Sequence, residues 1–572
     1  MRTLLIAALT ALALVPAPDE LDTFIRAQMA QRQINGLSMA IIENGKIEAR
    51  AYGVVGKGGP AVTTDTLFQA GSISKPVAAV GALRLVEQGT LALDEDVNAK
   101  LKTWRVPDNE FTKTEKVTLR RILSHSAGLT VHGFPGYAVT EKMPSLPDVL
   151  DGRGNTAPVR VNVVPGSLSR YSGGGYTVMQ LLVSDVTGKR FPQYMHDAVL
   201  APVGMTRSTY EQPLPAERAA QTASGYNADR SAVEGRWHVY PEMAAAGLWT
   251  TPTDLAKFAI EIQQSLAGKS TRVLSQKMTQ QLLTVQIGSS GLGFGLSGSG
   301  AARTFGHNGR DEGFDAQLTA FAETGQGVVV MINANDNSGM VGRIVNAVAR
   351  KYNWPSRSST KPAATDRVPT TVPLATVAGR YELSNNNMLT LVALDGTLFS
   401  DVNGLPDEEF VPMGGDRFGS TQRNITFTLA RGAGGEVTGL SWSANGQDRL
   451  VPRIGALPSL IKPESDPDSS FTRTVLETVT ALGAGGERAR SLTTLSAGAR
   501  EDLTAQPVDD LAGVGNLTFV AAQDVAGRRI ERHGGAVAKV LLYKTDTPRG
   551  SRYLMVHVTA DGLITDYDVV EK

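Results

Sequence analysis

The sequence predicts a mixed α/β (α+β) domain over residues 18–353, followed by a small antiparallel β domain and a small α+β domain. Three observations support this prediction. The chain has 572 residues, more than a single hydrophobic core sustains. Its apolar fraction of 41% and charged fraction of 20% are typical of soluble globular proteins. Strand-like runs begin and end the first region, with helical periods between them, which indicates one sheet completed by both ends of that region.

Within the first region, Asn44-Gly45 predicts a tight turn between two runs of strand character. Apolar residues then recur with the helical period in several segments, and two more strands are expected near the end. We expect helices at 25–34, 77–88, 178–186, 253–265 and 341–352, and strands at 37–42, 46–52, 316–322 and 327–333.

The C-terminal part of the chain has a different character. Residues 354–373 are rich in Pro, Ser and Thr and are predicted to be a linker. Residues 374–455 contain alternating apolar and polar side chains with turn signals, which indicates a small antiparallel β domain. A second linker is expected at 456–470. Residues 471–572 contain one helical period and then several strand-like runs, which predicts a small α+β domain.

Charge and composition exclude several classes of function. Lys plus Arg and Asp plus Glu are balanced at 56 each, so no net field attracts nucleic acid or an anionic membrane. The absence of cysteine excludes disulfides and thiolate metal sites. The histidines show no metal-ligand spacing, and no phosphate-binding glycine loop is present. We therefore predict no metal, no cofactor and no nucleic-acid partner.

The N-terminus has the features of a signal peptide. Arg2 precedes an apolar run from Leu4 to Ala17, which is shorter than the roughly 20 residues of a membrane span. A buried N-terminal helix is the alternative. We predict that residues 1–17 direct export, that the protein is periplasmic or secreted in a bacterium, and that no later segment spans a membrane.

Ser72 and Lys75 form a Ser-x-x-Lys pattern whose meaning depends on its setting. The same pattern begins at Ser358 and Ser459, but both lie in predicted linkers, which hold no nucleophile rigidly. Ser72 precedes a predicted helix, which places Lys75 one turn away on the same face. A lysine activates a serine only if its pKa falls from about 10.4 toward 7–8, and burial at a helix N-terminus acts in that direction. An ordinary helix start with an exposed lysine is the alternative.

Two further segments accompany this pair. Tyr171 lies in a turn and is followed by the glycines 173–175, which lead into a predicted helix. His307 lies in the segment 306–310, shortly before a predicted strand. A turn tyrosine and an edge histidine are the ordinary interpretations. The three segments together, in this order and spacing, favour a functional interpretation.

Over residues 20–350 the chain resembles the serine β-lactamase and penicillin-binding protein superfamily, in its class C, peptidase and esterase branch. This resemblance implies an antiparallel sheet flanked by helices, plus an all-helical subdomain. The regions after residue 374 resemble accessory modules of such proteins, a lipocalin-like barrel and an α+β module. The motifs that carry the resemblance are residues 67–75 around Ser72, residues 122–129 (Ile-Leu-Ser-His-Ser-Ala-Gly-Leu), Tyr171-Ser172-Gly173, Ala246-Gly247-Leu248 with Asp254-Leu255, and His307-Asn308-Gly309.

The resemblance implies a serine hydrolase that works through an acyl-enzyme. Ser72 would attack the acyl carbon, and Lys75 and Tyr171 would share the proton transfers, with Tyr171 activating the deacylating water. His307 stands where many lactamases have a lysine, and it would act as a donor that orients Tyr171 and the substrate.

The resemblance also assigns backbone and structural roles. The N–H groups of Ser72 and of Arg310, the residue after Gly309, would form an oxyanion hole. The side chain of Arg310 is a candidate for binding a substrate carboxylate. His125 is expected to make a structural hydrogen bond in a turn.

Two departures from the family pattern bear on the substrate. The second motif usually reads Tyr-x-Asn, but Gly173 replaces the asparagine that contacts a substrate amide. His307 weakens the fixed positive charge that faces a substrate carboxylate. Both departures favour hydrolysis of small esters, amides or short peptides over efficient β-lactam hydrolysis.

Other functions stay open. The rival enzymes are a β-lactamase and a D-amino-acid peptidase or carboxypeptidase. A slowly deacylating penicillin-binding sensor could signal through the C-terminal domains, although no membrane span connects it to the cytoplasm. A pseudoenzyme is disfavoured because Ser72, Lys75 and Tyr171 are all present. The sequence also leaves open whether the chain forms a homo-oligomer.

Overall fold

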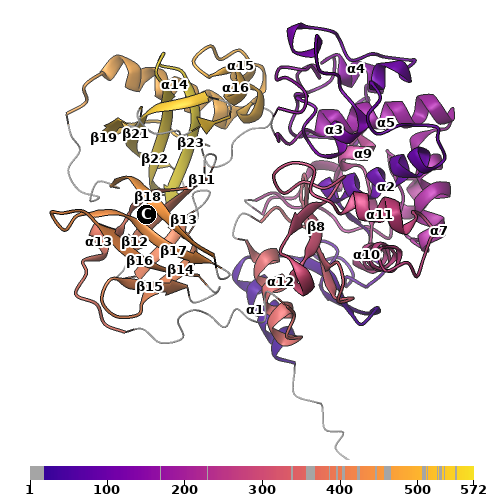
Figure 1. Ribbon diagram of the computed structural model, residues 1–572, viewed down its shortest axis with the longest axis horizontal. Coiled ribbons are helices and arrows are strands. Elements are labelled where there is room, and N and C mark those ends of the chain that lie inside the picture. Colours follow the sequence, from indigo (N-terminus) through magenta and orange to yellow (C-terminus); the bar gives the residue numbers. More distant parts are fainter. Residues whose placement is uncertain are drawn as a thin grey trace, which may run out of the picture.

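Figure 1 shows three units of the chain: a larger first unit (indigo to pink), a β barrel (orange) and a C-terminal unit (yellow) next to the barrel. The predictions for the signal peptide and for much of both linkers lie outside the described residues, and so do two of the turn signals within residues 374–455, Asp395-Gly396 and Asn445-Gly446. The computed structural model describes residues 19–571 apart from 168, 229, 337–338, 356–367, 385–386, 395–396, 402–405, 421–424, 445–446, 457–464, 505–510, 512, 525, 527–530, 534 and 548–549.

The first unit is built on a six-stranded antiparallel sheet with the order β2-β1-β10-β9-β8-β7. β1 pairs with β10, so both ends of the unit complete one sheet, as predicted. Asn44 and Gly45 have φ values of 52° and 73°, as the predicted turn requires. The strands are β1 (Gly36–Glu43), β2 (Lys46–Gly53), β7 (Gly295–Ser297), β8 (Thr304–Asp311), β9 (Phe314–Phe321) and β10 (Gly327–Ile332).

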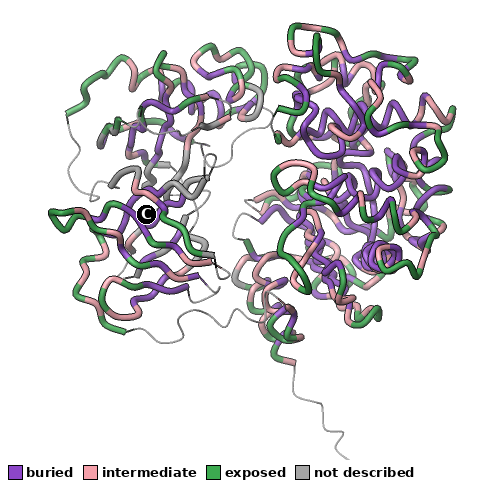
Figure 2. Tube along the Cα trace, viewed as in Figure 1, coloured by how far each residue is buried: buried purple, intermediate pink, exposed green. Residues whose placement is uncertain are grey.

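Helices cover both faces of this sheet because its central strands are apolar on both sides. In β10, Val330 packs with α1 and α12, whereas its neighbour Val329 faces the larger core, which includes α2 and α10. Figure 2 shows buried residues (purple) throughout the interior of the first unit. The helices at the sheet are α1 (Glu20–Gln31), α2 (Ser74–Glu87), α10 (Pro252–Leu266) and α12 (Met340–Lys351).

Between α2 and α10 the chain forms a mainly helical region, close to the all-helical subdomain that the resemblance implied. It differs in containing the short strand pair β4–β5, and a second pair, β3–β6, links it to the region before α2. The strands are β3 (Phe68–Gln69), β4 (Tyr137–Ala138), β5 (His238–Val239) and β6 (Trp249–Thr250), and the helices are α3 (Leu119–Leu123), α4 (Leu146–Leu150), α5 (Gly173–Thr187), α6 (Phe191–Met195), α7 (Ala201–Val203), α8 (Ala216–Ala219), α9 (Met243–Ala246) and, after α10, α11 (Gln276–Leu282).

The second unit is a closed antiparallel barrel of eight strands. Its interior contains aromatic side chains in contact, such as Phe427 stacked on Trp442 with ring centroids 5.9 Å apart. A short helix, α13 (Leu374–Val377), precedes the barrel. Its strands are β11 (Gly379–Ser384), β12 (Asn387–Leu394), β13 (Thr397–Asp401), β14 (Pro406–Pro412), β15 (Arg417–Ser420), β16 (Ile425–Arg431), β17 (Val437–Ala444) and β18 (Gln447–Ala456).

The C-terminal unit packs helices against one antiparallel sheet, which agrees with the predicted α+β character. Val475 and Val479 of its long helix lie in the same core as Leu554 and Val556 of β22. The helices are α14 (Ser469–Ala484), α15 (Gly486–Arg490) and α16 (Ala497–Leu503), and the strands are β19 (Thr518–Asp524), β20 (Glu531–Arg532), β21 (Gly535–Thr547), β22 (Gly550–Thr559) and β23 (Ile564–Glu571).

Candidate active site

Ser72 lies in a short turn that leads directly into a long buried helix. The turn (Gly71–Ile73) continues into α2, whose residues 74–83 are all buried. The amine nitrogen Nζ of Lys75 lies 2.9 Å from Ser72 Oγ and 2.9 Å from the carbonyl oxygen of Ala245. The predicted neighbours are therefore joined by a hydrogen bond.

The surroundings of Lys75 change its acidity. Lys75 is only 2% exposed. Burial lowers the pKa of Lys75 from 10.5 to about 7, and the nearby Asp311 acts in the opposite direction. At neutral pH a large share of Lys75 is thus an uncharged amine, which can accept the hydroxyl proton of Ser72.

The loop that carries Tyr171 is fixed by the residue after it. Ser172 caps the N-terminus of α5, where its Oγ accepts a hydrogen bond from Gly175 N–H at 2.9 Å. The same hydroxyl donates to the carbonyl oxygen of Thr130 at 2.8 Å. Tyr171 is therefore tied to a rigid helix start.

The phenol of Tyr171 lies beside the other two reactive groups. Lys75 Nζ is 4.9 Å from the centre of the Tyr171 ring. Burial raises the pKa of Tyr171, and a hydrogen bond with Ser72 acts in the opposite direction. Tyr171 therefore stays protonated at neutral pH. It is suited to donate or relay a proton rather than to act as a deprotonated general base.

Three of the chain's histidines surround Tyr171. Their ring centroids lie 4.2 Å (His125), 4.9 Å (His132) and 5.9 Å (His307) from that of the tyrosine. His132 Nδ1 is 3.2 Å from the Tyr171 carbonyl oxygen. The tyrosine ring is thus held among flat, polar side chains.

His125 makes the closest of these contacts and holds the loop at two points. Its Nδ1 accepts a hydrogen bond from Ser172 N–H at 3.1 Å, and its carbonyl oxygen accepts one from Arg170 N–H at 2.7 Å. Burial, together with the charge of Lys75, holds the pKa of His125 well below its usual value. His125 is therefore neutral, and it makes the structural hydrogen bonds expected of it.

The third predicted segment forms β8, and its alternation determines which side chains meet the site. Residues 307, 309 and 311 share one face because side chains alternate along a strand. Gly309 and Asp311 are buried, whereas Asn308 and Arg310 are exposed. His307 is half-buried on the inner face.

His307 is an uncharged ring in this site. Burial and the charge of Lys75 lower its pKa to about 4. Its Nδ1 lies 2.5 Å from the carbonyl oxygen of Asn308, so Nδ1 carries the hydrogen and donates it there. Nε2 is then an acceptor, whereas the resemblance implied a donor.

Two glycines let β8 pack closely against the turn that holds Ser72. A Cβ atom on Gly309 would lie 1.9 Å from the carbonyl oxygen of Ala70. A Cβ atom on Gly71, whose φ is +50°, would lie 2.4 Å from the backbone nitrogen of Arg310. The backbone nitrogen of Arg310 therefore lies next to the turn that holds Ser72.

The side chain of Arg310 is engaged elsewhere. Its Nε and Nη2 each lie 2.7 Å from one carboxylate oxygen of Asp315, and Nη2 lies 3.2 Å from the carbonyl oxygen of Asp336. This paired, two-point contact holds the guanidinium on the outer face of β8. The expectation that this side chain binds a substrate carboxylate is therefore not supported by the structure.

Asp311 was not predicted from the sequence as a residue of the site. It is 4% exposed, and its carboxylate accepts a hydrogen bond from Gly71 N–H. Burial holds the pKa of Asp311 well above its usual value, while Lys75 acts in the opposite direction. The alternation from His307 through Gly309 could have identified it.

Glu242 was also missed, and no sequence signal marks it. It is fully buried directly before α9, the helix whose Ala245 carbonyl binds Lys75. Neither of its carboxylate oxygens has a hydrogen-bond partner among the described residues. Burial raises the pKa of Glu242 from 4.5 to about 8.

The position of Gly173 explains how the site accommodates the loss of the family's asparagine. A Cβ atom there would lie 2.7 Å from the ring of Phe134 and 3.0 Å from the carbonyl oxygen of His132. Phe134 is buried at 7% exposure. An aromatic ring therefore occupies the space that a larger side chain would need.

The structure thus brings Ser72, Lys75, Tyr171, His307 and Gly309 together, with Arg310 present through its backbone. Such an arrangement can activate a hydroxyl, supply protons and stabilise an oxyanion. In the part of the chain that the structure describes, no group of His, Asp or Glu side chains could hold a metal ion. No described helix has the length and apolar character needed to cross a membrane.

Comparison with known proteins agrees with this geometry. The profile of the family described as Beta-lactamase matches residues 21–350. Penicillin-binding protein 4 of Amycolatopsis lactamdurans is 28% identical over 327 residues, which cover 54% of this chain and 83% of that protein. PbpX of Bacillus subtilis, a putative penicillin-binding protein, is 26% identical over 298 residues, 50% of this chain and 67% of its own length.

Among solved structures, the octameric penicillin-binding protein homologue from Pyrococcus abyssi covers 76% of this chain and 99% of its own, at 20% identity and a TM-score of 0.51. At that identity the likeness concerns the fold alone. The family match spans more than half of the chain and includes every motif of the site. On this evidence the chain belongs to the Beta-lactamase family, the serine β-lactamase and penicillin-binding protein superfamily.

Proposed function

We propose that this protein is an exported serine hydrolase that cleaves small esters or amides, including short peptides, through an acyl-enzyme on Ser72. The main support is the 2.9 Å contact between Ser72 Oγ and Lys75 Nζ, together with a lysine pKa of about 7. A serine beside an amine that is uncharged at neutral pH has the base that it needs.

In acylation, Lys75 takes the hydroxyl proton of Ser72 while Oγ bonds to the acyl carbon. The carbonyl electron pair moves to oxygen, and the N–H groups of Ser72 and Arg310 bind the oxyanion, each worth about 2.7–4 kcal/mol. The intermediate then expels an alcohol or amine, which takes a proton from Lys75 through Tyr171.

In deacylation the same groups act in reverse. A water molecule gives its proton to Lys75 through Tyr171 as its oxygen bonds to the acyl carbon. The second intermediate releases the acid, and Ser72 regains its proton. The protonated state of Tyr171 favours this relay over direct abstraction by a phenolate.

The substrate preference follows from the contacts that the site lacks. Phe134 fills the space of the missing asparagine at Gly173, the Arg310 guanidinium is bound to Asp315, and His307 is uncharged. These features favour substrates that need neither a side-chain amide contact nor a charge partner for a carboxylate.

Turnover of three substrates tests the proposal. We expect the wild type to hydrolyse a p-nitrophenyl ester faster than nitrocefin or a D-Ala-D-Ala peptide. Ser72→Ala should remove all of this activity, while Ser358→Ala and Ser459→Ala, which alter the other two Ser-x-x-Lys patterns, should keep it. Unchanged ester hydrolysis in Ser72→Ala would exclude Ser72 as the nucleophile.

The same assay separates the alternatives. Faster turnover of nitrocefin or of the D-Ala-D-Ala peptide would indicate a β-lactamase or a carboxypeptidase. A stable acyl adduct without turnover, seen by mass spectrometry, would favour the penicillin-binding sensor. Export is tested separately by cell fractionation, with and without residues 1–17.

A further inference from the structure

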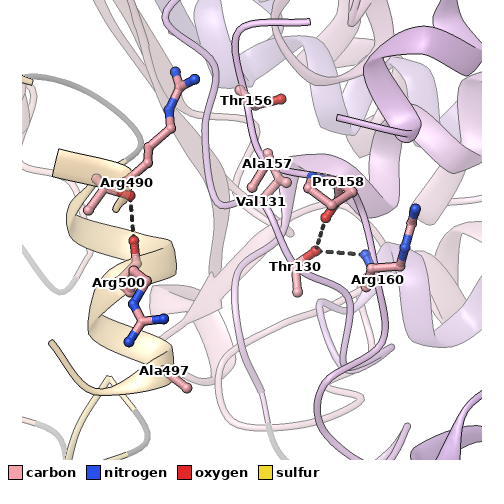
Figure 3. A pocket seen from close by; sticks show the side chains of 10 residues that line it. Thr130, Val131, Thr156, Ala157, Pro158, Arg160, Arg490, Ala497 and Arg500 are labelled. Atoms are coloured by element: carbon pink, nitrogen blue, oxygen red, sulfur yellow. Dashed lines mark hydrogen bonds between the residues drawn. The ribbon is translucent and has the colours of Figure 1, made fainter. Parts of the chain in front are cut away.

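A cavity of about 270 Å³ lies where the C-terminal unit meets the first unit (Figure 3). Val131 and the segment 156–158 line one side, and Arg490 and Arg500 line the other. The guanidinium of Arg490 crosses between the units and donates a hydrogen bond to the carbonyl oxygen of Asn155. The volume corresponds to about nine water molecules, so it suits a small ligand.

The lining of this cavity is positively charged. Arg160, Arg490 and Arg500 contribute guanidinium groups, and none of the described lining residues is acidic. The described hydrogen bonds of all three lead to backbone carbonyl groups, and no described carboxylate forms an ion pair with Arg490 or Arg500. Arg160 has one long ion pair, in which its Nη2 lies 3.8 Å from a carboxylate oxygen of Asp151. A carboxylate is the group that such guanidinium forks bind best.

The remainder of the lining is mostly apolar. Val131, Ala157, Pro158 and Ala497 present hydrocarbon surface between the arginines. A ligand that fills the cavity would therefore combine an anionic group with a short apolar body.

The cavity also touches the support of Tyr171. The carbonyl oxygen of Val131 accepts a hydrogen bond from Gly174 N–H at 2.9 Å, in the first turn of the helix that follows the tyrosine. The carbonyl oxygen of Thr130, the other lining residue of this segment, accepts a hydrogen bond from the Ser172 hydroxyl at 2.8 Å. The same two-residue segment thus faces the cavity and anchors the loop of the tyrosine.

We propose that this cavity binds a small organic anion, a carboxylate on a short apolar body, and that its occupancy changes the catalytic contribution of Tyr171. A bound carboxylate draws guanidinium groups from both units toward one charge. The C-terminal unit is then held more tightly against Thr130 and Val131. Because these two residues anchor the loop of Tyr171, the loop is also held more tightly. The second part of the proposal rests on the proposed hydrolase function.

Calorimetry with the full-length protein tests the binding. Hexanoate should bind once per chain, and hexanamide, its neutral counterpart, at least tenfold more weakly. Arg490→Ala and Arg500→Ala should each weaken hexanoate binding at least fivefold. Arg488→Ala should leave binding unchanged, because Arg488 is an exposed residue of the same helix as Arg490 but does not line the cavity.

Ala497→Phe provides a second variant that fills the cavity without changing its charge, and it should also block hexanoate. Equal binding of hexanamide, binding insensitive to Arg490 and Arg500, or no binding at millimolar hexanoate would each overturn the proposed site. Thermal unfolding of every variant confirms that it is folded before its binding is compared.

Ester turnover tests the link to Tyr171. Saturating hexanoate should change kcat of the wild type at least twofold, and the effect should vanish in Arg490→Ala. Binding without any change in kcat would overturn the link, and so would a change in kcat that persists in Arg490→Ala. A rise in KM alone would place hexanoate at Ser72 instead. If Ser72-dependent turnover itself is absent, the hydrolase proposal fails while the calorimetric result still decides the site.

Discussion

Lys75→Met should abolish turnover and yet stabilise the first unit at neutral pH. In the folded protein burial lowers the lysine pKa from 10.5 to about 7, whereas the unfolded chain keeps the ordinary value. At 1.36 kcal/mol for each pKa unit, this difference corresponds to about 5 kcal/mol. Methionine has a similar length and carries no charge, so the variant avoids this cost.

The loss of hydrogen bonds offsets part of the gain. Lys75 donates to Ser72 and to the Ala245 carbonyl, both at 2.9 Å. Leaving the buried carbonyl without a partner costs about 1–3 kcal/mol. The variant should therefore be more stable than the wild type by about 2–4 kcal/mol at pH 6.

The sign of the pH dependence follows from proton binding. Below pH 7 both states of the wild type hold the proton on Lys75, and the full cost applies. Between pH 7 and 10.5 the unfolded chain still binds the proton that the folded protein has released, so wild-type stability rises with pH. The advantage of Lys75→Met should therefore shrink by about 2.3 kcal/mol between pH 7 and pH 9.

Urea unfolding at pH 6, 7.5 and 9 measures this difference. Tryptophan fluorescence mainly reports the first unit, because four of the five tryptophans lie between residues 104 and 354. Lys57→Met, at an exposed lysine, is the matched control and should show no such trend. A stability difference that is independent of pH, or a wild-type kcat/KM that does not rise through pH of about 7, would refute the role assigned to the buried amine.

Three other substitutions test the surroundings of the site. Gly173→Asn should lower the free energy of unfolding by about 1–3 kcal/mol, because a Cβ atom there lies 2.7 Å from the ring of Phe134. Thermal unfolding should show partial recovery when Phe134→Ala is added, and no recovery would contradict this contact. His125→Leu removes the acceptor for Ser172 N–H and should lower kcat at least tenfold with little change in KM, whereas His125→Asn, which can restore an acceptor, should retain more activity. Equal losses in the two variants would exclude a positioning role. Burial raises the pKa of Glu242 from 4.5 to about 8, so wild-type stability falls as pH rises through that range, and Glu242→Gln should be more stable at pH 8 but not at pH 4. Equal unfolding free energies for the two proteins at pH 8 would contradict the raised pKa of Glu242.

The fold was predictable where local patterns determine it. The hairpin at Asn44-Gly45 and the long helices agree with the periodicity of their apolar residues, because each pattern follows from backbone geometry. Helix ends were less accurate. The first helix begins at Glu20 rather than near residue 25, because the side chain of Asp19 caps it. The segment around His307 was not recognised as a strand of its own, since its glycines weaken the strand pattern.

The site was predictable only in part, because local patterns indicate contacts only between residues that are close in sequence. The spacing of Ser72 and Lys75 lies within one helical turn, so the residues alone indicate their contact. Tyr171 and His307 could be assigned only through the family resemblance, because about a hundred residues or more separate each of them from Ser72 and Lys75. Asp311 and Glu242 were overlooked, since a single acidic residue has no pattern until the fold buries it.

By itself the sequence predicted Ser72 and Lys75 as a reactive pair and determined the order of the motifs and the absence of cysteine chemistry. Only the tertiary structure decided that Lys75 has a pKa of about 7, that Arg310 is bound to Asp315, and that Phe134 occupies the space at Gly173. The physical reason is the distance along the sequence over which each effect acts. Spacing within a helix is set by neighbouring residues, whereas burial and competing partners depend on segments that meet only when the chain is folded.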